Sequence, residues 1–322
     1  MDLTRLPRFF TTYAPTVSLE IAADRVTGVS LGRRSKGKGA GVVVQALPAG
    51  VVTPALNSTN IADSDRLDEV VRQVLSRLPG TPTRIALAVP DCAAKVSFMT
   101  FEQIPSRADE LEQLIRWQAK KTAPFRIEDA QVAYAGGIPM ETEGQEFVVS
   151  LMRRDIVQEY ETTCTRAGAH AGIVDLSSFS LINAILAGGV SHGGDWLLVH
   201  LASGYSSIAV VRQGALVLFR SRPADGTEGL ANLVHQTRMY YEDRVKGDGF
   251  AGAYLVVGTE AISTEHAAEL RRSVEASLGI PFEAIELSIG NAVTASAAGL
   301  TDLVAASFGL LLRDREVFAA TR

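Results

Sequence analysis

Apolar positions in the first part of the chain predict three strands, a helix and a fourth strand. Residues 16–52 hold three apolar segments separated by polar turns, a pattern typical of short β-strands. Residues 64–80 have apolar positions at helical spacing, begin at a candidate N-cap, Ser64, and end before Pro79. The apolar face of this helix holds Leu67, Val70, Val71, Val74 and Leu78. The run 84–90 is almost entirely apolar and predicts a strand buried on both faces of its sheet.

The second part of the chain repeats this order. Strands are predicted at residues 196–202, 206–214 and 215–222, a helix at 227–245, a strand at 253–258 and a helix at 263–279. Three strands, a helix, a strand and a helix thus occur twice, which indicates a duplicated supersecondary unit. Residues 300–314 predict a final helix that begins at Thr301 or Asp302.

A separate α/β module is predicted between the two repeats, roughly over residues 95–166, in the order strand, helix, strand, strand, helix. The stripe of its first helix, indexed at the helical period, holds Leu111, Leu114, Ile115, Gln118 and Thr122. Trp117 lies off that stripe. Because large aromatic side chains are usually core or inter-domain contacts, we favour packing of Trp117 against a neighbouring subdomain. The alternative is that Trp117 borders a groove.

Composition and charge limit the classes of partner. With 322 residues the chain is long enough for about two domains. Its 47% apolar and 21% charged content is that of an ordinary globular protein. The net charge of -5 disfavours binding to a phosphate polymer, so we expect no nucleic-acid partner.

The spacing of cysteine, histidine and apolar residues gives no redox, metal or membrane motif. Cys92 and Cys164 lie far apart without CxxC spacing, as expected for reduced thiols of a cytosolic protein. The five histidines include no helical i, i+4 pair and no cysteine companion, so no metal site is expected. The longest apolar run, residues 303–312, is too short to cross a bilayer, and residues 1–15 lack the apolar segment of a signal peptide. We therefore expect a cytoplasmic protein without direct membrane insertion.

The module and its flanks resemble the family of the type IV pilus assembly protein PilM. In residues 116–134 an Arg-Trp helix is followed by Pro-Phe, an acidic pair and a strand that ends in Tyr. The matching residues are Arg116, Trp117, Pro124, Phe125, Glu128, Asp129 and Tyr134. Residues 87–105 and 148–185 fit the segments that precede and follow it in this family, including Asp175 and the Ser178-Phe179 pair.

This resemblance implies an α/β protein with the actin-like fold, a duplicated ribonuclease H-like fold shared with FtsA and the sugar kinases. It also implies an inserted small α/β subdomain. The second lid subdomain of the actin-like pattern is reduced in this chain, which departs from the pattern there. We assign residues 1–94 to the first actin-like subdomain, completed by the C-terminal helix 301–314. Residues 95–170 then form the inserted subdomain, and residues 171–300 the second actin-like subdomain.

The resemblance also locates a degenerate nucleotide site. In the family an Asp-Ile-Gly type loop approaches the phosphates; residues 20–26 match it, and Glu20 keeps a carboxylate while Ala22 and Ala23 replace glycine and hydroxyl residues. His200 stands where the second loop has an aspartate. The candidate cofactor-binding residues are Glu20, Ser203, Gly204, Ser206, Ser207 and Gly258.

A covering lid is also missing from the pattern, because only about fifty residues and one helix separate the second loop from Gly258. We therefore expect no catalytic residue, no cofactor and no ATP turnover, and interpret residues 201–208 as a strand connection. Binding of ATP and magnesium at the degenerate site is the alternative.

The family suggests a function that needs a groove instead of a catalytic acid. PilM-like proteins bind the short cytoplasmic tail of the inner-membrane protein PilN and join the platform that links pilus motors to the membrane. We expect a cytoplasmic scaffold of this kind, attached to the inner membrane through a partner, with other platform or motor proteins as further partners. The predicted groove lies at the junction of the first half with the inserted module, near residues 89–96 and the Trp117 helix. Pro90, Val96 and Trp117 are the candidate partner-binding residues. Alternatives are an active actin-like ATPase and the cytoplasmic domain of a GspL-like type II secretion protein.

Overall fold

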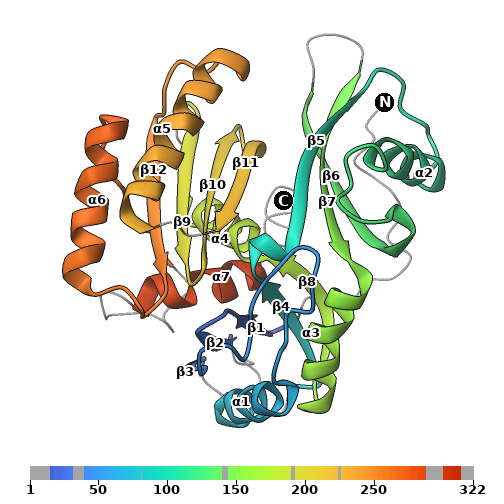
Figure 1. Cartoon of the computed structure of the whole chain (residues 1–322), viewed down its shortest axis with the longest axis vertical. Coiled ribbons are helices and arrows are strands. Elements are labelled where there is room, and N and C mark those ends of the chain that lie inside the picture. The colour runs from blue at the N-terminus through green and yellow to red at the C-terminus, as the bar shows by residue number, and fades with distance from the viewer. Residues whose placement is uncertain are drawn as a thin grey trace.

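The computed structural model describes residues 15–31, 40–80, 82–139, 144–189, 193–223, 226–287 and 300–312. The described residues form three β-sheets (Figure 1). A five-stranded and a four-stranded sheet correspond to the two repeated units, and a three-stranded sheet corresponds to the module between them.

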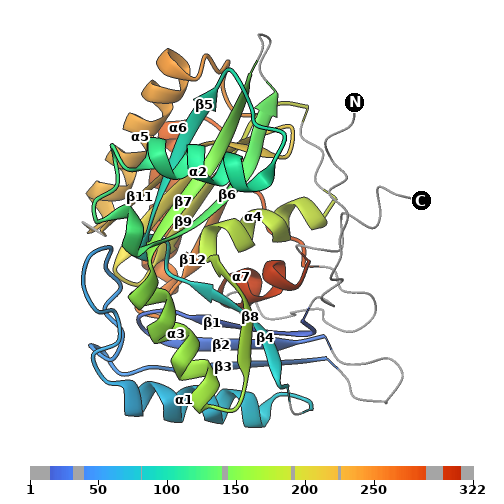
Figure 2. The ribbon, with the colours of Figure 1, turned by 90° about the vertical axis from the view of Figure 1, so that its right-hand side faces the viewer.

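The first sheet has the strand order β3-β2-β1-β4-β8. Its strands are β1 (Val17–Ile21), β2 (Arg25–Ser30), β3 (Gly41–Ala46), β4 (Arg84–Val89) and β8 (His170–Leu176). The first three form antiparallel pairs, whereas β4 lies parallel to β1 and β8 lies parallel to β4. Helices α1 (Ser64–Arg77) and α3 (Arg154–Arg166) cover one face of this sheet (Figure 2). Strand β4 is buried after Arg84, as predicted.

Helix α1 has the predicted buried face and a different cap. Its five predicted apolar residues, Leu67, Val70, Val71, Val74 and Leu78, all belong to the core of the first subdomain. The N-cap is Asp63, whose Oδ1 accepts a hydrogen bond from the backbone N of Arg66 at 3.0 Å. The prediction of Ser64 as the cap is therefore wrong by one residue, because the carboxylate one position earlier reaches a free N–H of the first turn.

The second sheet has the strand order β11-β10-β9-β12. Its strands are β9 (Trp196–Ala202), β10 (Tyr205–Arg212), β11 (Ala215–Pro223) and β12 (Gly252–Gly258). Helices α5 (Gly226–Arg244) and α6 (Thr264–Leu278) pack on one face. A single helix, α5, fills the interval between β11 and β12, as the prediction of a reduced lid requires.

Two helices, α4 (Ser177–Ala187) and α7 (Leu300–Leu312), form a shared layer between the two large sheets (Figure 1). On α7, Val304 and Phe308 pack with the first sheet, whereas Ala305 and Ala306 pack with the second. The Ser18 hydroxyl in β1 donates to the carbonyl of Ser307 at 2.5 Å. The C-terminal helix thus completes the first subdomain, as predicted, and also contacts the second.

The inserted module is a three-stranded sheet with the order β5-β7-β6 and one helix on its outer face (Figure 1). It comprises β5 (Ala94–Phe101), α2 (Ala108–Ala119), β6 (Ala130–Pro139) and β7 (Gln145–Arg153). Short 3₁₀ helices at Asp91–Ala93 and Ile127–Asp129 lead into β5 and β6. The module has its own core, in which Ile115 and Ala119 of α2 pack against the sheet.

The subdomain boundaries differ from those predicted at residues 170 and 171. Strand β8 pairs with β4, so residues 170–176 belong to the first sheet and do not open the second subdomain. Helix α3 also belongs to the first subdomain, because Ile156 and Tyr160 lie in its core. The insertion therefore ends near Arg153. The apolar pattern gives the type of an element, but it does not say which sheet a strand joins.

Gly309 tests the close crossing of α4 and α7. A Cβ at this position would lie 1.8 Å from the carbonyl oxygen of Ser180 and 2.8 Å from the backbone N of Ala184. We expect Gly309→Ala to lower the free energy of unfolding by about 3 kcal/mol, because overpacking forces the helices apart. Helix propensity alone predicts a gain of ~1 kcal/mol, so the sign measured by urea denaturation decides. A neutral or stabilising substitution would contradict the crossing.

Candidate functional site

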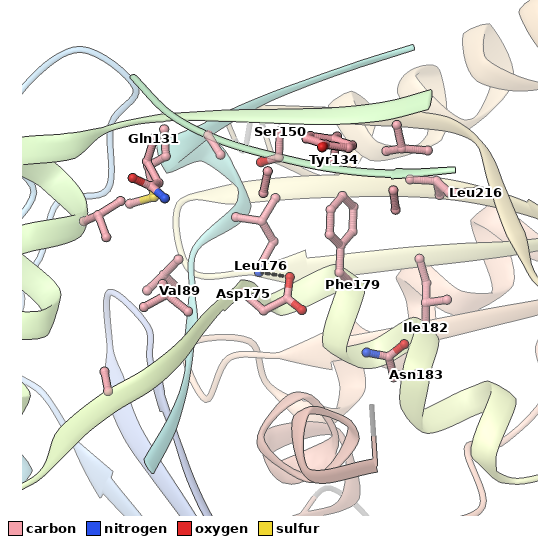
Figure 3. A pocket seen from close by; sticks show the side chains of 18 of the residues that line it. Val89, Gln131, Tyr134, Ser150, Asp175, Leu176, Phe179, Ile182, Asn183 and Leu216 are labelled. Carbon is pink, nitrogen blue, oxygen red and sulfur yellow. Dashed lines mark hydrogen bonds between the residues drawn. The ribbon is translucent and has the colours of Figure 1, made fainter. Parts of the chain in front are cut away.

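A cavity of about 770 Å³ lies where the inserted module, the first subdomain and α4 meet (Figure 3). Strands β6 and β7 form one wall, and β8 with α4 forms the opposite wall. The turn at residues 214–216, in the second subdomain, contributes a third side. All three parts of the structure therefore shape one opening.

The lining of the cavity is mainly apolar, with small residues on the β6 side. Ala133 and Ala135 of β6 are exposed and line the cavity, whereas Val132, which precedes them, packs into the core of the module. Tyr134, between the two alanines, also packs against that core and lines the cavity as well. Across from them, Phe179 and Ile182 project from α4 (Figure 3). The exposed face of β6 towards the cavity is thus formed by small side chains.

Both walls present the free edge of a strand. Within the described residues, β6 pairs with β7 alone and β8 pairs with β4 alone. Residues of both edge strands line the cavity, among them Gln131 on β6 and Gly172 on β8. An unpaired strand edge offers a row of backbone N–H and C=O groups to an added chain. The cavity can therefore bind an extended peptide by backbone hydrogen bonds as well as by apolar contact.

Three charged side chains line the cavity: Arg154, Glu161 and Asp175. Arg154 Nη2 donates to the carbonyl of Ala130 at 3.4 Å. Asp175 Oδ1 accepts a hydrogen bond from the backbone N of Leu176 at 2.9 Å, and its carboxylate lies beside the apolar lining (Figure 3). These groups give the opening polar points that can orient a bound chain.

Glu20, the carboxylate of the predicted nucleotide loop, is buried and fully engaged by side chains of this protein. Glu20 Oε2 accepts from Arg25 Nη2 at 2.9 Å, and Glu20 Oε1 accepts from the Ser177 hydroxyl at 3.0 Å. Arg25 is 1% exposed, and its Nη1 donates to the carbonyl of Gly258. The structure thus brings Glu20 and Gly258 together, as predicted, with the Arg25 guanidinium between them.

Beside this pair lies a buried cluster of Asp91, Ser178 and His200. The Ser178 hydroxyl donates to Asp91 Oδ2, and Asp91 Oδ1 accepts from the backbone N of Ser178 at 2.9 Å. His200 Nδ1 lies 3.0 Å from Ser178 Oγ. In a nucleophilic triad the histidine would lie between serine and acid, whereas here both groups meet the hydroxyl directly. Asp91 and Ser178 are 0% exposed, so the cluster connects elements and leaves no access to a substrate.

The predicted second loop is a tight turn between β9 and β10. Gly204 has φ +86°, a conformation that favours glycine, and no heavy atom lies within 4 Å of a Cβ built there. Ser206 and Ser207 are buried inside β10, whereas Ser203 is partly exposed in the turn. None of the six candidate cofactor-binding residues lines the cavity. Their proposed contact with nucleotide stays a prediction.

The three candidate partner-binding residues lie close to the cavity in sequence and outside its lining. Pro90 is buried, and Val96 packs against the core of the first subdomain. Trp117 is 60% exposed on α2, which covers the far face of the module sheet, and Lys121 Nζ lies 4.2 Å from its ring centre. The favoured packing of Trp117 against another subdomain is therefore wrong. The predicted position of the groove, at the junction of the first half and the module, agrees with the cavity.

Sequence reasoning missed the residues that form most of the cavity. Of the lining residues, Val89 and Ala94 fall inside the predicted stretch, and Val89 is labelled in the close view (Figure 3). A signal was present in β6, where Ala133 and Ala135 alternate with the larger Val132 and Tyr134. Small residues on one face of a strand indicate that another chain or subdomain approaches there.

The described residues offer no reactive thiol and no metal cluster. Burial raises the pKa of the Cys92 thiol to about 12 and that of Cys164 to about 12. No group of three His, Cys, Asp or Glu side chains in the described part of the chain could hold a metal ion. None of the described helices is both long and apolar enough to cross a membrane.

Comparison with known proteins identifies the family. Residues 19–247, more than two thirds of the chain, match the model of the type IV pilus assembly protein PilM. The chain belongs to the PilM family. This family is described by its role in type IV pilus assembly. The sequence has no significant match among curated proteins.

Solved structures give the same fold. The PilM-PilN type IV pilus biogenesis complex matches with a TM-score of 0.76 at 15% identity, over 93% of this chain and 98% of that chain. The ethanolamine utilization protein EutJ from Carboxydothermus hydrogenoformans matches with a TM-score of 0.50 at 13% identity, over 97% and 91%. At these identities the matches establish the fold, and the predicted actin-like architecture of this PilM-family protein is confirmed.

The structural role of Gly204 gives a test of the turn. Gly204→Ala is expected to lower the free energy of unfolding by about 1–2 kcal/mol, because a Cβ is strained at positive φ. Gly204→Asn is the matched control, since asparagine tolerates this conformation and is expected to cost less. Thermal unfolding of the three proteins measures both effects. Equal stability of the alanine variant would show that the turn does not depend on glycine.

Proposed function

We propose that this protein is a cytoplasmic scaffold of a type IV pilus inner-membrane assembly platform. Its cavity binds the short cytoplasmic tail of a PilN-like membrane protein, and this partner attaches it to the inner membrane. Motor or other platform proteins are proposed as further partners. The observation that carries the proposal is an apolar cavity flanked by two free strand edges.

The occupant expected from this geometry is an extended peptide with apolar side chains. A chain that adds to a strand edge makes regular backbone hydrogen bonds and alternates its side chains between two directions. Half of those side chains would meet Phe179 and Ile182 of α4, and the small alanines of β6 leave room for them. The volume lies within the range of about 300–1,000 Å³ of sites that enclose a ligand.

The solved relative supports the identity of the partner. That structure is described as a PilM-PilN complex, and it matches 93% of this chain. The short cytoplasmic tail of a membrane protein is expected to be a flexible segment. Such a segment can become ordered when it adds to a preformed strand edge. A scaffold with such a site links a membrane component to soluble ones without any chemical step.

We also propose that the protein acts without ATP turnover. Magnesium prefers several oxygen ligands, and both oxygens of the Glu20 carboxylate already accept hydrogen bonds from Arg25 and Ser177. His200 stands where the second loop of the family has an aspartate, and its Nδ1 lies 3.0 Å from Ser178 Oγ. A bound triphosphate with its magnesium ion would have to replace these internal hydrogen bonds.

Filling the cavity tests the peptide site. Ala133→Trp adds a large side chain at an exposed position of β6 that lines the cavity. We expect it to weaken binding of a synthetic peptide with the cytoplasmic sequence of the PilN-like protein by more than about tenfold, a loss of ~1.4 kcal/mol, measured by calorimetry. Because the position is exposed, the substitution should leave stability nearly unchanged.

The matched control is Gln113→Trp, which adds the same side chain on the exposed outer side of α2. Trp117→Ala is a second control on that side. Both are expected to bind the peptide like the unsubstituted protein. Equal affinity of the Ala133→Trp variant would overturn the cavity as the docking site, and loss of binding only in Trp117→Ala would move the site to α2.

A phosphate-release assay tests the absence of turnover. With Mg-ATP in excess we expect a rate equal to that of the heat-denatured protein, and no change in the midpoint of thermal unfolding. The physical reason is that the Glu20 carboxylate is occupied by Arg25. A rate that disappears in Glu20→Gln would instead favour the ATPase alternative, because that substitution removes one negative charge and keeps the side chain's shape.

A further inference from the structure

The Arg25 side chain crosses from the first subdomain to the second in the interior of the protein. It begins on β2, and its guanidinium donates to Glu20 on β1 and to the carbonyl of Gly258 at the end of β12. The side chains of Arg25 and Glu20 are 2% and 3% exposed. The contact therefore joins two sheets that share no strand, through a charge that is removed from water.

A second contact joins the same two loops. The Thr259 hydroxyl donates to Asp24 Oδ2 at 2.6 Å, next to the 3.3 Å ion pair of Asp24 with Arg25 Nη1. The turn between β1 and β2 thus meets the residues after β12 at two successive positions. Two adjacent contacts fix the spacing of the loops and also their relative register.

The surroundings of Gly258 leave little freedom for another arrangement. A Cβ at this position would lie 2.9 Å from His200 Nε2 and 3.6 Å from Arg25 Nη2. The backbone of β12 therefore approaches His200 more closely than a Cβ would allow, and the guanidinium lies in van der Waals contact with the same position. The backbone N of Val257, one residue earlier, donates to Asp302 Oδ2 of α7 at 3.0 Å, so this strand end is also tied to the shared helical layer.

The cost of burying the Arg25 charge stabilises the arrangement in which the two subdomains both contact it. A buried charge is costly unless it is paired, and removing one partner leaves the other uncompensated. Opening the two subdomains would separate the guanidinium from the Gly258 carbonyl while Glu20 stayed beside it on the same sheet. The closed arrangement is then the one in which Arg25 has acceptors on both sides.

We propose that Arg25 is a built-in cation that holds the two subdomains closed in the absence of any bound nucleotide or metal ion. It lies between an acidic side chain of one subdomain and a backbone carbonyl of the other. Because residues 214–216 of the second subdomain line the cavity, this closure also fixes the distance of that wall from β6 and β8. The inference does not depend on what the cavity binds.

Hydrogen exchange and a spin-label distance test the proposal on the full chain without a partner. In Arg25→Ala we expect amide exchange at residues 254–259 to accelerate by at least about tenfold. Loss of the Arg25 contact with the Gly258 carbonyl lowers the free energy of local opening. Cysteines introduced by Arg72→Cys and Glu269→Cys lie on exposed positions of α1 and α6 and can carry the labels. Their distance distribution should widen in Arg25→Ala and stay narrow otherwise. Cys164 is buried and Cys92 is partly buried, and burial raises the pKa of both thiols, which limits labelling there.

Matched variants distinguish the loss of the Arg25 contact between the subdomains from a general loss of stability. Arg66→Ala removes an arginine from the exposed pair with Glu69 and should change neither readout. Thr259→Val removes the hydroxyl that donates to Asp24 Oδ2 and accepts from the backbone N of Ala261, and it leaves Arg25 in place. It should produce a smaller change of the same kind, so it serves if Arg25→Ala does not fold. In Arg25→Ala, millimolar guanidinium chloride should restore the narrow distance distribution by occupying the vacated site.

Two results would overturn the proposal. An unchanged label distance with unchanged exchange at residues 254–259 in Arg25→Ala and Thr259→Val would show that the helical layer alone holds the subdomains. Narrowing of the distance in Arg25→Ala by Mg-ATP, with no effect of guanidinium, would show that the site is built for nucleotide and that Arg25 is not its permanent occupant.

Discussion

The crossing of α4 and α7 between the two large sheets is the packing constraint on which the other features depend. Gly309 allows α7 to approach the backbone of α4, so one helical layer serves both subdomains. The position of α4 then has two consequences. Its first residues, Ser177 and Ser178, bind Glu20 and Asp91, and the neighbouring Phe179 and Ile182 line the cavity. One helix thus carries residues of both the inner polar cluster and the cavity.

The polar interior is organised as a set of internal connections. Glu20, Asp91 and Asp24 each accept hydrogen bonds from side chains of other segments, and their acceptors face inward. Such a network restricts the relative position of the segments that it joins, because every unsatisfied buried group would be costly. This arrangement favours a fixed relative position of the two subdomains. The cavity lies outside the network, where a chain from another protein can enter.

Local patterns predict most helices and strands, because the apolar period of each depends on neighbouring residues alone. The buried face of α1 and the nearly all-apolar β4 are examples. The features that failed depend on distant residues. Strand β8 pairs with β4, and Trp117 is exposed to solvent. The Arg25 guanidinium donates to the carbonyl of Gly258, which is distant in the sequence. The sequence around Arg25 shows only an arginine that opens a strand, which is ordinary on a surface.

The two tryptophans of the chain report on different regions of the molecule. Trp117 stands in solvent on the outer helix of the module, with Lys121 over its ring, whereas Trp196 is 3% exposed and packs edge-on against Tyr254. An indole in water emits at longer wavelength than an indole in an apolar core and is quenched more readily by dissolved iodide. The intrinsic fluorescence of the unlabelled protein therefore separates events on the surface of the module from events in the second subdomain.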